Sequence, residues 1–167
     1  VETKKVLSAV TKSLGRKIDI LGMDACLMSM AEVVYQVRDS VLVSVGSEEV
    51  EPGDGWPYDT ILKALVAKPE MTAQQLAALI VEKYIASYGP DTNVTQAACE
   101  LSKCGELAKA IDRLAKALMS ELSDPKIRGA IFECRDQVQD YDVADYVDLY
   151  NFCDLLAGKI SKGSLAT

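Results

Sequence analysis

Apolar positions in the first half of the chain follow helical spacing in two segments and strand spacing in two others. Helical spacing is found at residues 6–14, before Gly15, and at residues 27–37, whereas residues 17–21 and 41–45 are short apolar runs typical of buried strands. Strands and helices that alternate in this way are joined by right-handed crossovers, which place the strands side by side in parallel. The pattern therefore predicts an α/β fold with a central, mostly parallel sheet flanked by helices.

Residues 46–57 separate the second predicted strand from the next helices. This segment is rich in glycine, proline and acidic side chains, which predicts a loop. Helical spacing resumes at residues 58–66. A further helix is expected after Thr72, because Thr72-Ala-Gln-Gln is a capping box, and it should end before Gly89-Pro90.

The second half of the chain is predicted to be mainly helical. Residues 94–101 have strand character, and helical spacing follows them, including a helix that starts with Pro125 after Asp124. We expect the whole chain, 1–167, to form part of a single domain, with a strand-and-helix portion at 1–101 and a mainly helical portion at 102–167.

Composition and charge narrow the classes of function. With 167 residues, of which 49% are hydrophobic, the chain is long and apolar enough to bury a core. Its formal net charge of −7 and the lack of a basic stripe argue against nucleic-acid binding and favour attraction of a basic substrate. No apolar run approaches the roughly 18 residues of a membrane span, and the first residues lack the pattern of a signal peptide.

The five cysteines do not form the pattern of a disulfide framework or a zinc site. Their number is odd, no Cys-x-x-Cys is present, and the spacings match no zinc motif. Cys99, Cys134 and Cys153 lie in apolar strand-like or helical segments, where we expect them to act as small buried hydrophobes. Cys104, beside Gly105 near a turn, is left open.

Cys26 is the candidate with the most specific chemistry. The strand predicted at residues 17–21 would deliver it to the carboxyl edge of the sheet, and the helix predicted at residues 27–37 follows it directly. Free N–H groups at a helix start stabilise a thiolate, so a reactive cysteine is expected there. The chain contains no histidine, the usual base of a cysteine peptidase, so the partner of Cys26 would have to come from another polypeptide.

The residues alone leave a second interpretation open. A cysteine in an apolar neighbourhood is more often part of the core than a nucleophile. The lack of histidine and the surplus of acidic groups are also typical of a non-catalytic, helix-rich interaction domain in which Cys26 is buried. An associated chain that carries a histidine would distinguish the enzyme from such a domain.

Four motifs carry a resemblance to a known family. They read Ile-Leu-Gly-Met-Asp-Ala-Cys-Leu-Met, Ala-Glu-Val-Val-Tyr, Ser-Glu-Glu-Val-Glu-Pro-Gly-Asp-Gly-Trp-Pro-Tyr and Tyr-Val-Asp-Leu-Tyr, at residues 20–28, 31–35, 47–58 and 146–150. In this order and spacing they resemble the clostripain family of bacterial cysteine endopeptidases, which belongs to the caspase-like clan together with gingipains and legumain. The resemblance covers nearly the whole chain.

The resemblance implies a fold, an activity and a partner. The fold is a caspase-like α/β fold whose sheet is completed by a second, light chain. The activity is cleavage after arginine or lysine by a Cys–His dyad, with the histidine on a separate N-terminal chain produced by (auto)proteolytic processing of a zymogen. Secretion or retention at the cell envelope of a bacterium is implied as well. Val1 would then be a processing site, and an end at Thr167 suggests a second cut, a trimmed chain or a short family member.

The resemblance also assigns roles to individual residues. Cys26 would attack the substrate carbonyl, and its backbone N–H would donate to the oxyanion. Asp24 and Asp54 would line the pocket for the basic side chain, because an unpaired buried cation is costly. Two alternatives stay open: Asp24 caps the helix predicted to start near residue 27, and Asp54 is only a turn residue.

Other residues of the acidic loop are expected to have structural roles. Glu48, Glu49 and Glu51 are most often just a solvated acidic surface, with a minor alternative role in binding a cation or the substrate. Trp56 and Tyr58 are expected to anchor the loop by packing, although an aromatic ring beside a basic pocket can also stack on arginine.

Calcium is the one cofactor that the resemblance suggests, and the sequence itself requires none. Clostripain-like enzymes often depend on calcium, and residues 46–59 offer carboxylates suited to a hard cation. The chain has no EF-hand spacing. Calcium is therefore an expectation from the resemblance and has no dedicated motif.

Overall fold

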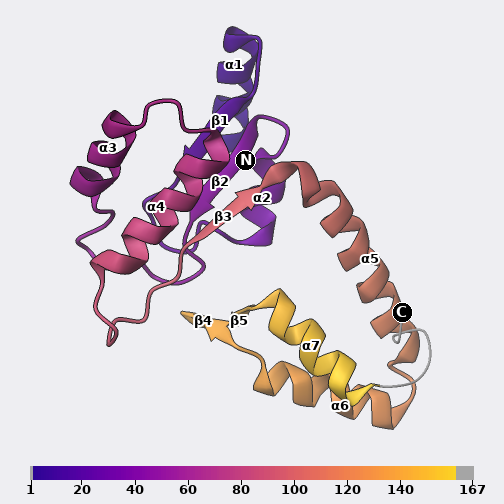
Figure 1. Ribbon diagram of the computed structural model, residues 1–167. Coiled ribbons are helices and arrows are strands. Elements are labelled where there is room, and N and C mark those ends of the chain that lie inside the picture. Colours follow the sequence, from indigo (N-terminus) through magenta and orange to yellow (C-terminus); the bar gives the residue numbers. More distant parts are fainter. Residues whose placement is uncertain (1, 161–167) are drawn as a thin grey trace. The chain divides into compact units, whose positions relative to one another are not determined.

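The computed structural model describes residues 2–160, which divide into two compact units. The first unit is Val1–Gly105 and the second is Glu106–Thr167, and each is described by itself (Figure 1). The expectations that Val1 is a processing site and that Thr167 marks a cut or a trimmed end lie outside the described residues.

The first unit is built on a three-stranded sheet in the order β1-β2-β3. Strand β1 (Ile18–Gly22) pairs in parallel with β2 (Val41–Gly46), as the sequence predicted. Strand β3 (Ala97–Glu100) runs antiparallel to β2, so the expected parallel arrangement holds for the first pair only. Two helices rather than one connect β2 to β3, so the chain returns to the end of the sheet at which it left.

Helices cover both faces of this sheet (Figure 1). One face carries α3 (Tyr58–Ala67) and α4 (Ala73–Ser87), whose N-terminus is the expected Thr72 capping box. The other face carries α1 (Glu2–Leu14), which ends at Gly15. The two core clusters have separate members: Val43, Val45, Trp56, Ile61, Ala77, Ile80 and Tyr84 in the first, and Leu7, Val34, Val37, Val41, Leu101 and Cys104 in the second.

The helix expected at residues 27–37 is shorter than predicted. Helix α2 spans Ala31–Val37, and a turn takes the place of its first residues. Leu27 has a φ of 62°, which is incompatible with a right-handed helix. The backbone N–H groups of Leu27 and Ser29 donate instead to Glu49 O at 3.3 Å and to Ser47 O at 2.9 Å. Bonds to a distant loop therefore replace the first turn of the predicted helix.

The second unit is mainly helical, with a hairpin that the sequence analysis did not predict. A short 3-10 helix (Leu101–Lys103) precedes α5, which begins within the first unit. The hairpin turns at Asp142, which has a φ of 57°. The elements are α5 (Cys104–Glu121), α6 (Pro125–Gln137), β4 (Asp140–Tyr141), β5 (Val143–Val147) and α7 (Leu149–Lys159).

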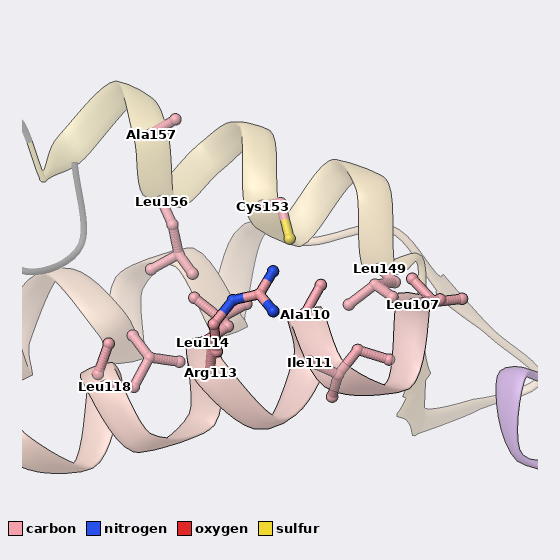
Figure 2. A pocket seen from close by; sticks show the side chains of 11 residues that line it. Leu107, Ala110, Ile111, Arg113, Leu114, Leu118, Leu149, Cys153, Leu156 and Ala157 are labelled. Atoms are coloured by element: carbon pink, nitrogen blue, oxygen red, sulfur yellow. The ribbon is translucent and has the colours of Figure 1, made fainter. Parts of the chain in front are cut away.

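Residues of α5 and α7 line an open cavity of about 590 Å³ with mostly apolar walls (Figure 2). Cys153 lines it, with its sulfur directed from α7 toward α5, and its side chain is exposed. The expectation that Cys153 is buried is therefore wrong, because Leu156 and Ile160 form the face of α7 that packs into the core. Cys134 is fully buried, as expected.

Two further cysteines, Cys99 and Cys104, belong to the first unit. Cys99 is partly buried on β3, and its sulfur lies 3.8 Å from Ser29 Oγ. Cys104, which the sequence left open, is buried at the start of α5. All five cysteines are free thiols. No helix within residues 2–160 combines the length and the apolar character that crossing a bilayer requires.

Candidate active site

Cys26 lies just beyond the carboxyl end of β1, beside the loop that follows β2. Its side chain is partly buried and its thiol is free. The backbone N–H of Glu51 donates to Cys26 Sγ at 3.3 Å, and the thiol is 3.9 Å from Glu51 O. The alternative interpretation, in which Cys26 is buried in a core, is therefore wrong on this point.

The expected source of thiolate stabilisation is not where the sequence placed it. Helix α2 begins at Ala31 and its N-cap is Met30, so no helix starts at Cys26. The group that the structure does place at the sulfur is the Glu51 N–H. A backbone N–H that donates to sulfur favours its anionic form, because hydrogen bonds to a charged acceptor are stronger than neutral ones.

Thr95 fixes the beginning of the loop that carries Glu51. The Thr95 hydroxyl lies 2.9 Å from Ser47 Oγ, and it accepts hydrogen bonds from the N–H groups of Glu48 and Glu49 at 3.1 and 3.0 Å. Ser47 is completely buried. Backbone N–H groups that are shielded from water need hydrogen-bond acceptors, and the single Thr95 hydroxyl serves as acceptor for two of them. Thr95 therefore sets the path along which the loop approaches Cys26.

Asp24 is held by the far end of the same loop. Its Oδ2 accepts hydrogen bonds from Tyr58 Oη at 2.9 Å and from the backbone N–H of Trp56 at 3.4 Å. Because α2 begins at Ala31, Asp24 does not cap that helix. Asp24 is an exposed residue, so it is accessible to a ligand.

The approach of the loop to Asp24 requires a glycine. Gly55 has a φ of 62°, and a Cβ at this position would lie 2.9 Å from Asp24 Oδ2. A side chain would therefore meet both the left-handed backbone and the carboxylate. Gly22 has a similar role at the end of β1, where an added Cβ would lie 3.0 Å from the ring of Trp56.

Trp56 anchors the loop, as expected from the sequence. Its side chain is 7% exposed and belongs to the core cluster on the α3 and α4 face. Tyr58 is 52% exposed, and its ring centroid lies 6.3 Å from that of Trp56. The expectation of packing is confirmed for Trp56, whereas Tyr58 acts mainly through its hydrogen bond to Asp24.

Glu51 is the residue whose importance the sequence analysis missed. Its Oε1 accepts a hydrogen bond from Trp56 Nε1 at 3.3 Å. The pKa of Glu51 is raised to about 7: burial is the largest cause, a hydrogen bond to Asp24 and the charge of Asp24 act in the same direction, and the Trp56 N–H opposes them. The signal available in the sequence was the nearby Trp56, the only tryptophan in the chain.

The raised pKa of Glu51 has a definite sign for stability. The proton binds more tightly in the folded protein, where the pKa is about 7, than at the ordinary value of 4.5. Its contribution to stability is complete below pH 4.5 and is lost as the pH rises through 7. Glu49, by contrast, bonds locally through Oε1 to the N–H of Val50 at 2.7 Å.

Asp54 is exposed at the tip of the loop and stays a prediction as a pocket residue. Burial raises the pKa of Tyr88 first, and the charge of Asp54 is the next cause. The Tyr88 hydroxyl donates to Gly55 O at 2.7 Å. Asp54 therefore lies within electrostatic reach of the segment that contacts Asp24, but among the described residues no hydrogen bond joins the two carboxylates.

The described residues do not fit a metal centre. Within residues 2–160, no group of three or more histidine, cysteine, aspartate and glutamate side chains is arranged to hold an ion. Calcium prefers six to eight oxygen ligands. The expected calcium dependence therefore stays a prediction, for which residues 2–160 show no group of ligating side chains, and no step below depends on it.

These features define an α/β protein with a partly exposed cysteine at the carboxyl end of a strand, bonded by the backbone N–H of Glu51, whose carboxyl group interacts with Asp24. A model of the clostripain family matches residues 1–163. The chain therefore belongs to the clostripain family, a family of cysteine peptidases. Its fold is the caspase-like α/β fold of the solved C11 proteases.

Individual relatives are similar over most of this chain but are themselves longer. Clostripain from Hathewaya histolytica is 28% identical over 83% of this chain, which spans only 34% of that protein. An inactive zymogen C11 protease from Parabacteroides distasonis has a TM-score of 0.62 at 22% identity, covering 97% of this chain and 43% of its own. A B. fragilis cysteine protease has a TM-score of 0.59 at 21% identity, covering 98% and 66% respectively.

The close approach of Gly55 to Asp24 can be tested by substitution. Gly55→Ala should lower the free energy of unfolding by about 1–2 kcal/mol from the left-handed backbone alone, with a further loss from the contact with Asp24. Gly53→Ala is the matched control, because nothing lies within 4 Å of a Cβ built there. Urea denaturation of the purified variants measures both values. Equal losses in the two variants would contradict the close approach.

Proposed function

We propose that this chain is the nucleophile-bearing part of a cysteine endopeptidase that cleaves after arginine or lysine. The observation that carries the proposal is the juxtaposition of the Cys26 thiol with the Glu51 N–H and with a pair of carboxyl groups, Asp24 and Glu51, which we call the acidic pair. One part of the arrangement suits a thiolate nucleophile, and the other suits a cationic side chain.

The chemistry divides between this chain and a second one. The Cys26 thiolate attacks the scissile carbonyl, the Cys26 backbone N–H donates to the resulting oxyanion, and the leaving amine departs to give a thioester. Water then hydrolyses the thioester and releases the thiol. A histidine must take the thiol proton and protonate the amine. Since this chain contains none, the histidine is supplied by a separate N-terminal chain.

The architecture of the sheet supports such a partner. Among the described strands, β1 pairs with β2 on one side only, so its other edge offers backbone groups to a further strand. Asp24 is also an exposed residue, and the cavity of the second unit is lined by none of these residues. We infer that the second chain adds strands beside β1 and supplies the remaining walls of the substrate pocket.

The solved relatives support a bacterial enzyme that acts outside the cytoplasm. One of them is described as a secreted C11 cysteine protease from Bacteroides thetaiotaomicron in complex with an irreversible peptide inhibitor, with a TM-score of 0.60, 22% identity, and coverage of 96% of this chain and 44% of its own. Secretion or retention at the cell envelope is accordingly our proposal for this protein.

Covalent labelling tests the nucleophile. A peptidyl acyloxymethylketone that ends in lysine or arginine should modify Cys26 in the assembled enzyme, and Cys26→Ala should abolish labelling. Cys153→Ser is the matched control, because Cys153 is the exposed cysteine of the chain's described part. Intact mass and peptide mapping identify the labelled thiol. Undiminished labelling of Cys26→Ala would remove Cys26 from the mechanism.

Complementation tests the origin of the histidine. The chain alone should not hydrolyse arginyl substrates, because it has no imidazole to move the proton. Co-expression or refolding with the upstream histidine-bearing segment should restore hydrolysis, and the same segment with that histidine replaced by alanine should not. A fluorogenic arginyl peptide provides the assay. Robust turnover by the chain alone would contradict the divided dyad.

Substitution of the aspartates tests the specificity. Asp24→Asn removes a charge that would pair with the buried substrate cation, a loss of about 2–5 kcal/mol, so kcat/KM for basic substrates should fall roughly 30- to 5000-fold. Asp54→Asn should have a similar or weaker effect. Asp59→Asn is the control, since Asp59 is exposed on α3 and pairs only with Lys63 at 3.8 Å. Unchanged selectivity in both pocket variants would refute the assignment.

A further inference from the structure

The two carboxyl groups of the acidic pair have no positively charged partner among the described residues. Asp24 carries a charge next to Glu51, and no lysine or arginine within residues 2–160 forms an ion pair with either group. Glu51 Oε2 is buried and accepts no hydrogen bond in the described part of the chain. Burial of a carboxylate oxygen without a hydrogen-bond donor costs free energy, so this oxygen needs either a proton or a cation as a partner.

A proton meets this need in the empty site. When Glu51 is protonated, its carboxyl group can donate toward Asp24, which is the interaction that helps to raise the Glu51 pKa to about 7, after the larger effect of burial. Asp24 remains an acceptor for Tyr58 Oη.

The groups around the acidic pair add no positive charge. Burial is the first cause of the raised pKa values of Tyr58, Tyr84 and Tyr88, and the charges of the acidic pair raise each of them further. These phenols are therefore neutral at pH 7. The remaining titratable neighbours are Asp54, which acts on Tyr88, and the Cys26 thiol. A cation for the pair has to come from a ligand.

We propose that Glu51 is a further specificity-determining residue, and that in the empty site it holds a proton directed toward Asp24, which a cationic substrate side chain displaces to solvent. This inference rests on the proposed function and extends it, because the sequence motifs pointed to Asp24 and Asp54 only. The exchange is balanced: a guanidinium or ammonium group enters with one positive charge, and one proton leaves. The occupied pocket then contains two carboxylates paired with one cation.

The backbone and side chain of Glu51 couple this exchange to catalysis. The N–H of Glu51 donates to Cys26 Sγ at 3.3 Å, while its Oε1 accepts from Trp56 Nε1 at 3.3 Å. Trp56 is itself fixed in the core, so Glu51 has little freedom to turn away. One residue, Glu51, therefore carries both the carboxyl group that would bind the substrate cation and the N–H that contacts the attacking sulfur.

The exchange makes binding of a cation depend on pH in a defined way. Below the midpoint of this proton, release of one proton per bound cation lowers the affinity about tenfold for each pH unit. Above the midpoint no proton is released, and the affinity levels off. A neutral ligand displaces no proton, so its affinity should not follow this titration.

The indole of Trp56 reports the proton without any requirement for catalysis. Its emission should titrate with a midpoint near pH 7 in an assembled enzyme that carries Cys26→Ala, a background that removes the thiol. Subtracting the emission of a Trp56→Phe variant isolates this indole from tryptophans in the second chain. Glu51→Gln should abolish the titration, and Asp24→Asn should move its midpoint to lower pH. Glu49→Gln, two residues away in the same loop, should leave it unchanged.

Stability gives a second readout of the same proton. Between pH 4.5 and 7 the free energy of unfolding should fall with pH in the Cys26→Ala enzyme and should fall less in the Glu51→Gln variant. A midpoint near pH 4.5 in the emission, or a titration that persists in Glu51→Gln, would overturn the inference. If Glu51→Gln fails to fold, Asp24→Asn still tests the inference, because the shift of the emission midpoint expected in Asp24→Asn does not depend on the Glu51→Gln variant.

The ligand side of the inference is tested with small probes. N-acetylarginine amide should shift the emission midpoint to lower pH, whereas N-acetylcitrulline amide, its neutral analogue, should not. In the active enzyme, KM for an arginyl peptide should fall about tenfold per pH unit up to the midpoint, and Glu51→Gln should flatten this dependence. Arginyl hydrolysis without the emission titration would refute only this inference. The titration without arginyl hydrolysis would refute only the proposed function.

Discussion

The site depends on the way in which the loop after β2 is tied across the carboxyl end of β1. Backbone bonds from Leu27 to Glu49 and from Ser29 to Ser47 join the two segments, and the Thr95 hydroxyl holds the same loop from the side of β3. The N–H groups of these bonds would otherwise lie in the first turn of the predicted helix. The first turn of the predicted helix does not form, and the N–H of Glu51 donates to the Cys26 sulfur.

The same loop brings together groups that would clash or repel one another in most settings: a backbone segment against a carboxylate, and one carboxyl group against another. Two glycines permit it: Gly22 lets the ring of Trp56 lie on β1, and Gly55 lets the backbone pass next to Asp24. The loop then places Glu51 near Asp24 without a compensating cation among the described residues. Arrangements of this kind lower the stability of an isolated domain, and they persist where a ligand or substrate makes use of them.

Local signals explain which parts of this structure could be predicted from sequence. The Thr72 capping box, the stop of α1 at Gly15 and the apolar run of β2 depend on neighbouring residues alone, and all three are confirmed. The start of α2 could not be predicted, because hydrogen bonds to residues about twenty positions away replaced the helical ones. The β4–β5 hairpin escaped notice because β4 is only two residues long.

The site divides in the same way. Cys26 and Asp24 could be proposed from the sequence because a motif of adjacent residues marks them, whereas Glu51 sits in a run of acidic residues that has the composition of a solvated surface. What distinguishes Glu51 from Glu48 and Glu49 is the burial of one oxygen and its contact with Trp56. Both are products of the folded loop, so no pattern of charges along the chain could have revealed them.

A pair of carboxyl groups that holds one proton gives a protease a property that two separate carboxylates lack. In the proposed arrangement the empty site would hold one negative charge instead of two, so the chain would not need to keep an unpaired buried carboxylate while no substrate is present. A neutral side chain that enters leaves the proton in place and gains no ion pair. A cation gains two partners once the proton has left, and the proton leaves more easily as the pH rises. On the proposed exchange, discrimination between basic and neutral residues would be set by the environment of Glu51, and it would increase with pH up to the point at which Glu51 has lost its proton.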